Sequence, residues 1–201
     1  ALPMKRAADV LLSTFGILLL SPIMLAIAII IRWQLGSPVL FVQQRAGLHG
    51  EPFRLIKFRT MLDEQDASGG TRSEAERITR VGRALRSTSL DELPELWNVL
   101  RGEMSLVGPR PLLLDYLPLY SPRQMRRHEV RPGISGLAQV KGRNALTWED
   151  RFELDVWYVE NRSFLLDAKI LFLTVLRVLQ REGINSAGQT TMARFTGSDR
   201  S

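Results

Sequence analysis

VLLSTFGILLLSPIMLAIAIII, residues 10–31, is the stretch that decides how this 201-residue chain folds. It contains no charged residue. As a helix rising about 1.5 Å per residue it would be roughly 33 Å long, which is enough to cross the hydrocarbon core of a bilayer. The sequence therefore predicts a membrane segment at this position.

The middle of the stretch is Ser21-Pro22, where proline removes a helical hydrogen bond and clashes with the carbonyl four residues earlier. We expect a bend there, with the Ser21 hydroxyl bonding a freed backbone group. Lys5 and Arg6 precede the stretch and Arg32 follows it, so the preference of positive charge for the cytoplasmic side acts on both ends. Two topologies fit equally: a re-entrant helix that enters and leaves one leaflet, and a spanning helix kinked at Pro22. A cleaved signal peptide fits less well, because the apolar run continues past the small-residue site at 26–28.

The composition indicates an anionic partner. The chain has 27 Lys and Arg against 21 Asp and Glu, a net charge of +6, which favours phosphates, acidic lipids or nucleic acid. Cysteine is absent, which excludes disulfides and thiolate metal sites. With only His49 and His128 as imidazole ligands, Mg²⁺ on oxygen ligands is a better expectation than zinc.

The pattern of apolar residues predicts an α+β, mainly helical fold with amphipathic surface helices and a small β-hairpin. We expect three parts: a re-entrant membrane helix at 1–36, a cytosolic catalytic domain resting on the membrane at 37–183, and a C-terminal arm at 184–201. The expected elements are a hairpin of 39–44 and 52–60, a polar loop at 61–73, a helix at 74–86, a helix within 87–102 that begins shortly before Pro94, an extended piece at 137–140, and helices at 147–161 and 167–182.

Several basic segments have two interpretations each. Lys57 and Arg59 alternate onto one face of the second hairpin strand, which is either a solvated face or a phosphate contact. The arginine-rich helix at 74–86 either lies on a membrane surface or turns a solvated face outward. Arg110 stands between Pro109 and Pro111, so its guanidinium lies on a stiff arm suited to a bidentate grip on phosphate.

The acidic pair Asp91-Glu92 is the candidate catalytic centre. Asp91 could attack phosphorus as a nucleophile while Glu92 and Mg²⁺ neutralise the phosphate oxygens. The competing account is structural, because Ser89 and Glu92 have the spacing of a capping box at a helix start.

The motifs together resemble the bacterial sugar transferase family, and in particular its small monotopic phosphoglycosyl transferases that serve protein glycosylation. The resemblance covers almost the whole chain. It rests on Ser21-Pro22, KFRTM at 57–61, SLDELPELWNVL at 89–100, GPRP at 108–111, RPGISG at 131–136 and Gly142-Arg143-Asn144.

The resemblance implies a two-step reaction at the cytoplasmic face of the bacterial inner membrane. Asp91 would attack the β-phosphate of a UDP-sugar and release UMP, after which polyprenol (undecaprenyl) phosphate would take the sugar phosphate. Glu92 would act beside Asp91, with Mg²⁺ held by both carboxylates, and Ser21-Pro22 would form the break of a helix that dips into one leaflet. The expected phosphate-binding residues are Lys57, Arg59, Arg86, Arg110, Arg131, Gln139 and Arg143, and nucleic acid is not expected as a partner.

Two other classes of protein remain as alternatives. A membrane-anchored nucleic-acid or lipid-binding module would also be basic, and it would not need the carboxylate of Asp91. A phosphatase or a direct-displacement transferase would use Asp91 only as a base or metal ligand and would form no covalent intermediate.

Overall fold

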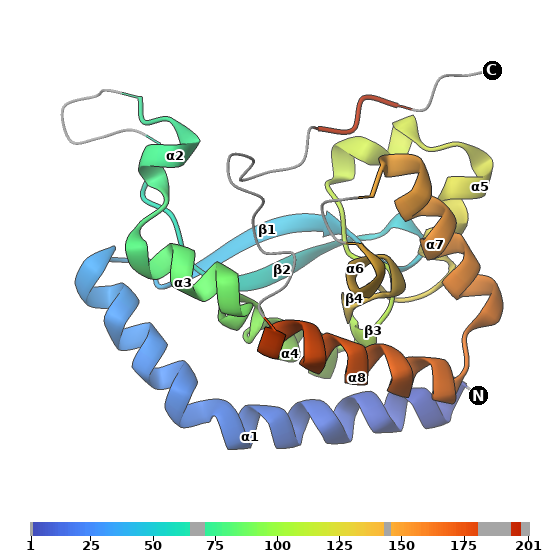
Figure 1. Cartoon of the computed structure of the whole chain (residues 1–201), viewed down its shortest axis with the longest axis horizontal. Coiled ribbons are helices and arrows are strands. Elements are labelled where there is room, and N and C mark those ends of the chain that lie inside the picture. Colours follow the sequence, from blue (N-terminus) through green and yellow to red (C-terminus); the bar gives the residue numbers. More distant parts are fainter. Residues whose placement is uncertain (1, 65–70, 143–145, 181–193, 198–201) are drawn as a thin grey trace.

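The computed structural model describes residues 2–64, 71–142, 146–180 and 194–197. Its longest element, α1 (Leu2–Gln34), is one helix that continues through Pro22 and bends in its middle (Figure 1). The Ser21 hydroxyl donates to the Leu18 carbonyl at 2.9 Å, which is the acceptor that Pro22 leaves without an amide donor four residues later. The predicted bend and the predicted role of Ser21 are both confirmed.

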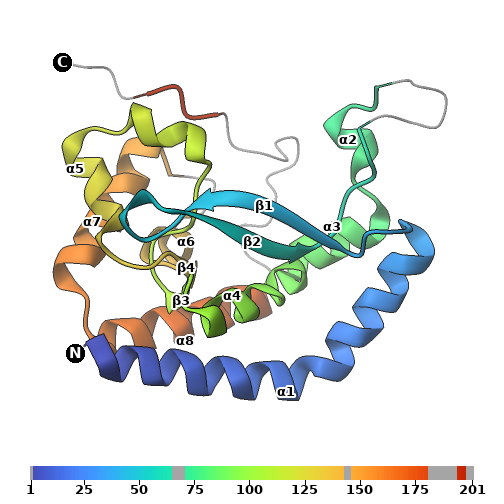
Figure 2. The same ribbon diagram turned by 180° about the vertical axis from the view of Figure 1, so that it is seen from behind.

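Both arms of α1 are fixed to the same globular body. In the first arm, Arg6 donates to the carbonyls of Val99 and Leu100, and Asp9 accepts from the Leu106 amide at 3.1 Å. In the second arm, Ile27, Ile31 and Leu35 are buried in a cluster with core residues of the body. Figure 2 shows the body lying within the angle of the bent helix. Among the described helices, α1 is the one long and apolar enough to cross a membrane.

The predicted hairpin is confirmed. Strands β1 (Leu40–Ala46) and β2 (Pro52–Phe58) are antiparallel, joined through the short 3₁₀ turn η1 (Leu48–Gly50). Phe41 stands opposite Lys57 and Gln43 stands opposite Leu55. Since directly opposed residues share a face of a sheet and side chains alternate along each strand, Phe41, Gln43 and Arg45 lie on the same face as Lys57.

The single helix expected at 74–86 is wrong: the segment forms two helices, α2 (Glu74–Arg77) and α3 (Arg80–Thr88). Ile78 pairs with Met61 in an isolated β-bridge, and the Thr79 hydroxyl caps α3 by accepting from the Gly82 amide. A Cβ on Gly82 would lie 1.9 Å from the Thr60 carbonyl oxygen, so glycine lets α3 lie directly against the chain that continues from β2.

The capping box is also wrong. Ser89 has a left-handed backbone, with φ of 56°, and its side chain caps nothing. The acidic pair lies in the 3₁₀ turn η2 (Leu90–Glu92), and α4 (Glu95–Arg101) begins after Pro94 rather than before it. The reason is tertiary, because the Glu92 carboxylate forms ion pairs with β2 and with a later loop instead of returning to its own backbone.

The second half of the chain forms short elements and two long helices. In chain order these are β3 (Ser105–Val107), η3 (Leu114–Leu119), α5 (Pro122–Met125), η4 (Arg126–Glu129), β4 (Gly133–Ser135), α6 (Leu137–Lys141), α7 (Trp148–Asn161) and α8 (Phe164–Gln180). Strands β3 and β4 are parallel. The extended piece expected at 137–140 is wrong, because that segment is α6, with the Val140 amide donating to the Gly136 carbonyl. Helices α7 and α8 are confirmed, although α8 begins three residues earlier than expected.

Together these elements confirm an α+β, mainly helical fold. Helix α8 runs beside the first arm of α1 in both views (Figures 1 and 2), and Lys5 of α1 forms an ion pair with Asp167 of α8. At the opposite side of the body, Phe195 is buried in an aromatic cluster with Tyr116, Tyr120 and Phe152. Of the expected C-terminal arm at 184–201, residues 184–193 and 198–201 lie outside the described residues.

Replacing Ile31 with alanine tests whether the second arm of α1 is part of the core. Ile31 is fully buried, whereas Ile29 on the same helix is 45% exposed. Ile31→Ala should lower the free energy of unfolding by about 2–5 kcal/mol through the lost burial and the cavity left behind. Thermal unfolding in detergent measures the effect, and Ile29→Ala is the matched control. Equal small losses for both variants would contradict the packing of this arm.

Candidate active site

Asp91 presents a free carboxylate at the centre of the site. Its side chain is buried, with a residual exposure of 8%, and no other described residue donates a hydrogen bond to it. Burial and the neighbouring Glu92 carboxylate raise the pKa of Asp91, while Lys57, Arg110 and Arg86 act in the opposite direction. Those cations favour the charged form of Asp91 and so oppose the rise of its pKa. Since they do so without bonding the carboxylate, its oxygens remain available to a ligand.

Glu92 is held by two cations from different parts of the chain. Its Oε1 atom accepts from Lys57 of β2 at 2.8 Å and from Arg110 at 2.6 Å. Although burial opposes ionisation, Arg110 and Lys57 together hold the pKa of Glu92 well below its usual value. Glu92 is therefore a fixed anion that positions two cations beside Asp91.

Arg110 is itself held from behind by a buried ion pair. Arg127 donates to the Arg110 carbonyl at 2.8 Å, and its guanidinium binds Asp155 of α7 at 2.7 Å, with both side chains almost fully buried. The two prolines that flank Arg110 add backbone stiffness. The predicted stiff arm is therefore present, and Arg127 and Asp155 fix its base.

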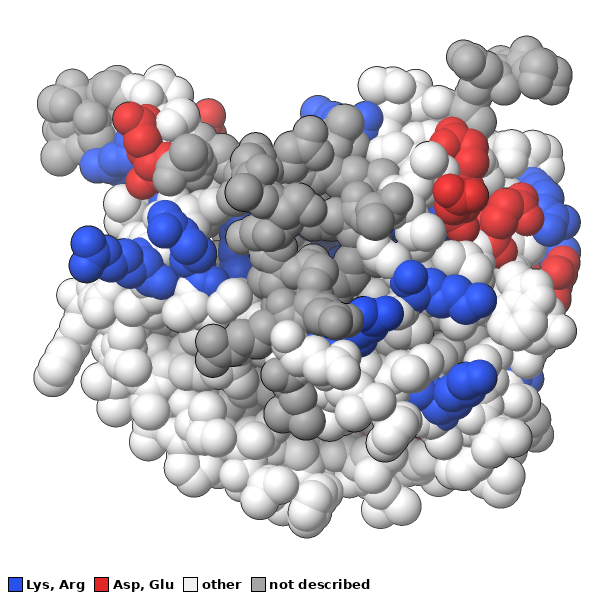
Figure 3. Space-filling view, in the orientation of Figure 1, with Lys and Arg blue, Asp and Glu red and all other residues white. Residues whose placement is uncertain are grey.

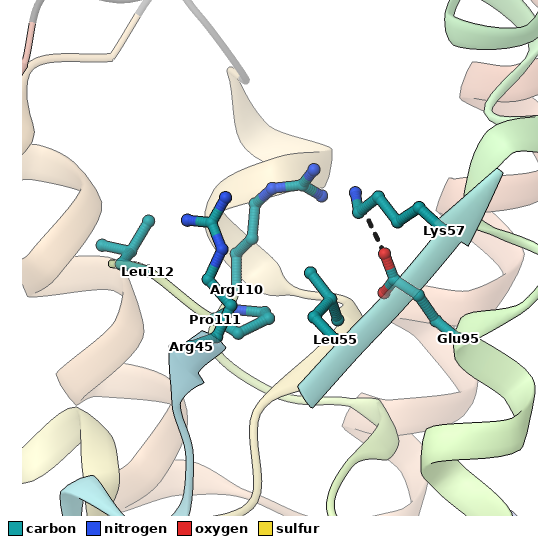
Figure 4. Close-up of a pocket in the computed structure, with 7 residues that line it drawn as sticks. All are labelled: Arg45, Leu55, Lys57, Glu95, Arg110, Pro111 and Leu112. Atoms are coloured by element: carbon teal, nitrogen blue, oxygen red, sulfur yellow. Dashed lines mark ion pairs between the residues drawn. The ribbon is translucent and has the colours of Figure 1, made fainter. Parts of the chain in front are cut away.

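Glu95 is a second buried carboxylate on the same lysine. Its Oε1 atom lies 3.0 Å from Lys57 Nζ, as the close-up in Figure 4 shows. Burial, with repulsion from Glu92 as the next cause, raises the pKa of Glu95 to about 7. Lys57 thus contacts one carboxylate that is firmly ionised and one that titrates near neutral pH.

A cleft of about 1260 Å³ connects this charged centre with the apolar helices. Asp91, Glu92 and Arg86 line one part of it, and Leu20 of α1 and Val175 of α8 line another. The cleft can therefore receive a ligand that has both an anionic group and an apolar chain.

The structure brings together some of the predicted phosphate-binding residues and separates others. Lys57 and Arg110 meet at Glu92, and Arg86 lines the cleft while bonding the Thr60 hydroxyl. Gln139 also lines the cleft, and its Oε1 atom is buried without a described partner.

Two predicted arginines are already engaged with the protein. Arg59 is buried, donates to the carbonyls of Ser37 and Met61, and pairs with Asp63, so it holds the loop after β2 although it borders the cleft. Arg131 donates to the carbonyl of Gly102 at the end of α4. Arg143 lies outside the described residues.

Sequence reasoning missed five residues of the site: Gln43, Arg45, Glu95, Arg127 and Asp155. The strand alternation that places Gln43 and Arg45 on the face of Lys57 was available in the sequence. No local pattern distinguishes Arg127 and Asp155 from surface charges, because their pairing joins segments 28 positions apart.

The carboxylates can contribute to a metal site but cannot complete one. Among the described residues, no three acidic or histidine side chains gather closely enough to hold a metal ion by themselves. Asp91 and the second oxygen of Glu92 could supply the one or two carboxylates that Mg²⁺ takes when substrate phosphates and water provide its other ligands. The donor set therefore fits a magnesium ion that binds together with a phosphate-bearing ligand.

The long apolar helix and the basic cleft indicate a membrane-associated protein with a site suited to phosphate groups. A sequence model described as bacterial sugar transferase matches residues 1–181, and the chain belongs to that family.

Three relatives show how far the similarity extends. The chain is 56% identical to the uncharacterised sugar transferase EpsL of Bacillus subtilis, over 97% of this chain and 96% of that protein. It is 42% identical to a UDP-glucose:undecaprenyl-phosphate glucose-1-phosphate transferase of Klebsiella pneumoniae, over 86% of this chain. It is 41% identical to a UDP-N-acetylgalactosamine-undecaprenyl-phosphate N-acetylgalactosaminephosphotransferase of Aeromonas hydrophila, over 87% of this chain. The chain spans 39% and 43% of the lengths of these last two proteins.

Replacing Glu95 with glutamine should change stability in a pH-dependent way. Burial raises the pKa of Glu95 from 4.5 to about 7, so the folded state binds this proton more tightly than the unfolded chain does. The resulting stabilisation is complete below pH 4.5 and is lost as the pH rises through about 7. Glu95→Gln should therefore raise the free energy of unfolding by about 1–3 kcal/mol at about pH 8, and with it the melting temperature. Near pH 4.5 the substitution should change both quantities little.

The measurement is thermal unfolding in detergent at the two pH values. Glu153→Gln is the control, because Glu153 forms an exposed ion pair with Arg123 and should change stability by less than about 1 kcal/mol at either pH. A Glu95→Gln protein that is less stable than its parent at high pH would contradict the assignment.

Proposed function

We propose that this protein is a phosphoglycosyl transferase that moves a sugar-1-phosphate from a UDP-sugar to undecaprenyl phosphate, with release of UMP. The observation that carries the proposal is the Asp91 carboxylate, which is buried, unbonded by the described residues and surrounded by Lys57, Arg110 and Arg86. The relatives from Klebsiella and Aeromonas are named for this reaction with different sugars. They support the reaction class but not one particular sugar.

In the proposed first step, an oxygen of Asp91 attacks the β-phosphorus of the UDP-sugar. A bond forms between that oxygen and phosphorus, the bond to the bridging oxygen breaks, and its electron pair leaves on UMP. In the second step, an oxygen of the lipid phosphate attacks the same phosphorus and the carboxylate of Asp91 departs. The product is an undecaprenyl diphosphosugar, the first membrane-bound intermediate of a glycoconjugate.

The basic side chains would act mainly by position and charge, as in other phosphoryl transfers. Lys57 and Arg110 are already oriented by Glu92, so they need little rearrangement to meet the equatorial phosphate oxygens. Arg86 would approach from α3, where its Nε atom bonds the Thr60 hydroxyl at 3.0 Å. Since Glu92 is engaged by both cations, Asp91 is the better nucleophile of the pair.

We also propose that Mg²⁺ binds with the donor, held by Asp91 and Glu92. The ion would neutralise diphosphate charge and stabilise the departing phosphate. The two adjacent carboxylates support this assignment, since Mg²⁺ commonly takes one or two carboxylates together with phosphate oxygens.

The re-entrant topology is part of the proposal. Both arms of α1 are bonded to or buried in one body, and a straight spanning helix would need its second end on the other side of the membrane. In Figure 3 the lowest part of the visible face, over α1, shows no charged side chains among the described residues, and Lys and Arg lie above it. This distribution supports one leaflet as the site of α1, with the basic residues at headgroup height on the cytoplasmic face of the inner membrane.

The covalent step can be tested by mass spectrometry of the intact protein. Incubation with Mg²⁺ and a panel of UDP-sugars, without lipid acceptor, should leave a phosphosugar on the peptide that contains Asp91 and release an equal amount of UMP. Asp91→Asn should abolish the adduct and lower turnover at least a thousandfold, on the order of 4 kcal/mol in barrier height. Asp115→Asn is the control, because Asp115 is an exposed residue that pairs with Arg194.

Each outcome of that experiment separates two classes of function. Lipid-dependent turnover without any adduct would move Asp91 to the role of a base or metal ligand in a direct displacement. An unaltered protein with neither adduct nor turnover for any donor would contradict the transferase assignment itself.

The topology can be tested with single cysteines, because the chain has none of its own. Ala7→Cys and Gln34→Cys place thiols at exposed positions in the two arms of α1. Glu149→Cys places a thiol at an exposed position of the globular body and so reports on which side of the membrane the body lies. A membrane-impermeant maleimide should label all three in inverted inner-membrane vesicles and none in intact spheroplasts. A spanning helix would instead give opposite labelling for the two arms.

A further inference from the structure

Arg45 of β1 is a partly buried cation without an acidic partner. Its guanidinium donates to the Gln43 side-chain oxygen at 2.7 Å, and its Nε atom is buried without a hydrogen-bond acceptor. No carboxylate of the described residues lies within ion-pair distance of it. Leaving a guanidinium donor buried and unbonded costs free energy, so the arrangement favours a ligand that supplies an acceptor.

The surroundings of Arg45 have an excess of positive charge. Together with Lys57, Arg110 and Glu95, Arg45 lines a small cavity (Figure 4). Burial, with repulsion from Arg110 as the next cause, lowers the pKa of Arg45, although a guanidinium remains charged near neutral pH. Three cations therefore line the cavity, with Glu95 as the one carboxylate among its described residues. The neighbouring Glu92 is already shared by Lys57 and Arg110.

Among the cations of the site, Arg45 lies beyond Arg110 on the side away from Asp91. The basic groups that influence Asp91 most are Lys57, Arg110 and Arg86, whereas the charged groups next to Arg45 are Arg110 and Glu95. In Figure 4 the Arg110 guanidinium stands between the Arg45 guanidinium and the Lys57 amine. The cations thus form a row that begins beside Asp91 and ends at Arg45.

We infer that Arg45, oriented by Gln43, binds the second phosphate of the diphosphate donor, the one that leaves with the nucleotide. This assignment rests on the proposed function. A row of cations longer than one phosphate matches a donor with two adjacent phosphates better than an acceptor with one. Arg45 also lines the large cleft, but the small cavity that it shares with Arg110 and Lys57 is not lined by α1 or α8. The apolar surface that suits the acceptor's chain, Leu20 of α1 and Val175 of α8, is therefore a different part of the cleft.

The inference gives Arg45 a role in the first chemical step. As the bond between the β-phosphorus and the bridging oxygen breaks, the electron pair stays on the nucleotide phosphate, whose negative charge increases. A guanidinium on that phosphate would stabilise the charge as it develops, with the bidentate geometry that arginine offers. Gln43 is a positioning residue in this scheme, since it acts by holding Arg45.

The test compares Arg45→Gln with Arg54→Gln. Both changes remove one arginine from the same hairpin, but Arg54 is exposed and points to the opposite face of β2. Arg45→Gln should raise the KM for the UDP-sugar and the inhibition constant of UMP on the order of tenfold to a hundredfold, the range for losing a hydrogen bond to a charged group. The KM for undecaprenyl phosphate should stay unchanged, and Arg54→Gln should leave all three constants unchanged.

Two further measurements distinguish a loss of donor binding from a loss of folding. Gln43→Ala should raise the same donor constants by a smaller factor, because Arg45 loses its orientation but keeps its charge. Equilibrium binding of UMP to Asp91→Asn and to the double variant Asp91→Asn, Arg45→Gln should differ by a similar factor without any chemistry taking place. Melting temperatures identify any variant that is not folded.

The outcomes distinguish this inference from the function on which it rests. Unchanged donor and UMP constants in Arg45→Gln, or a raised KM for the lipid alone, would overturn the assignment of Arg45 while leaving the transferase intact. Absence of both turnover and adduct in the unaltered protein would overturn the proposed function instead.

Discussion

The Glu92 carboxylate is the interaction on which the geometry of the site depends. Through one oxygen it joins Lys57 of the hairpin and Arg110 of the proline-flanked loop to the turn that holds Asp91. Removing one partner from such a buried pair leaves an uncompensated charge, so the three segments are strongly constrained to stay together. Asp91 is the adjacent residue and takes no part in the network. It is therefore held in place by its neighbour while no other described side chain bonds its own oxygens.

Local patterns in the sequence were sufficient for α1, its bend, the hairpin and the long helices α7 and α8. They failed where a distant segment decides the outcome. The helix expected at 74–86 is interrupted because Ile78 pairs with Met61 and Thr79 caps the start of α3. The capping box of Ser89 and Glu92 was a sound local interpretation. It is absent because tertiary ion pairs take the Glu92 carboxylate.

The same limit applies to the site residues. The chain has 27 lysines and arginines, and the sequence does not tell which of them already have a protein partner. Arg59 and Arg131 bind backbone carbonyls and so serve the fold. Arg45 was overlooked although it lines the cavity. Its significance is that none of the carboxylates in the described part of the chain pairs with it, which the sequence alone does not show. Only the arrangement in space distinguishes a satisfied guanidinium from one that still needs an acceptor.

The bend of α1 also bears on how the protein reaches its membrane. In the re-entrant topology, the basic residues before and after the apolar run stay on the side where the ribosome makes them. Moving even one such side chain to the bilayer centre costs on the order of 3 kcal/mol. In the re-entrant topology neither basic flank has to cross the bilayer, so this cost does not arise. Insertion then requires only the uncharged middle of the helix to leave water, and no polar part of the chain has to be translocated. A body that has already folded in the cytosol could thus anchor itself without unfolding.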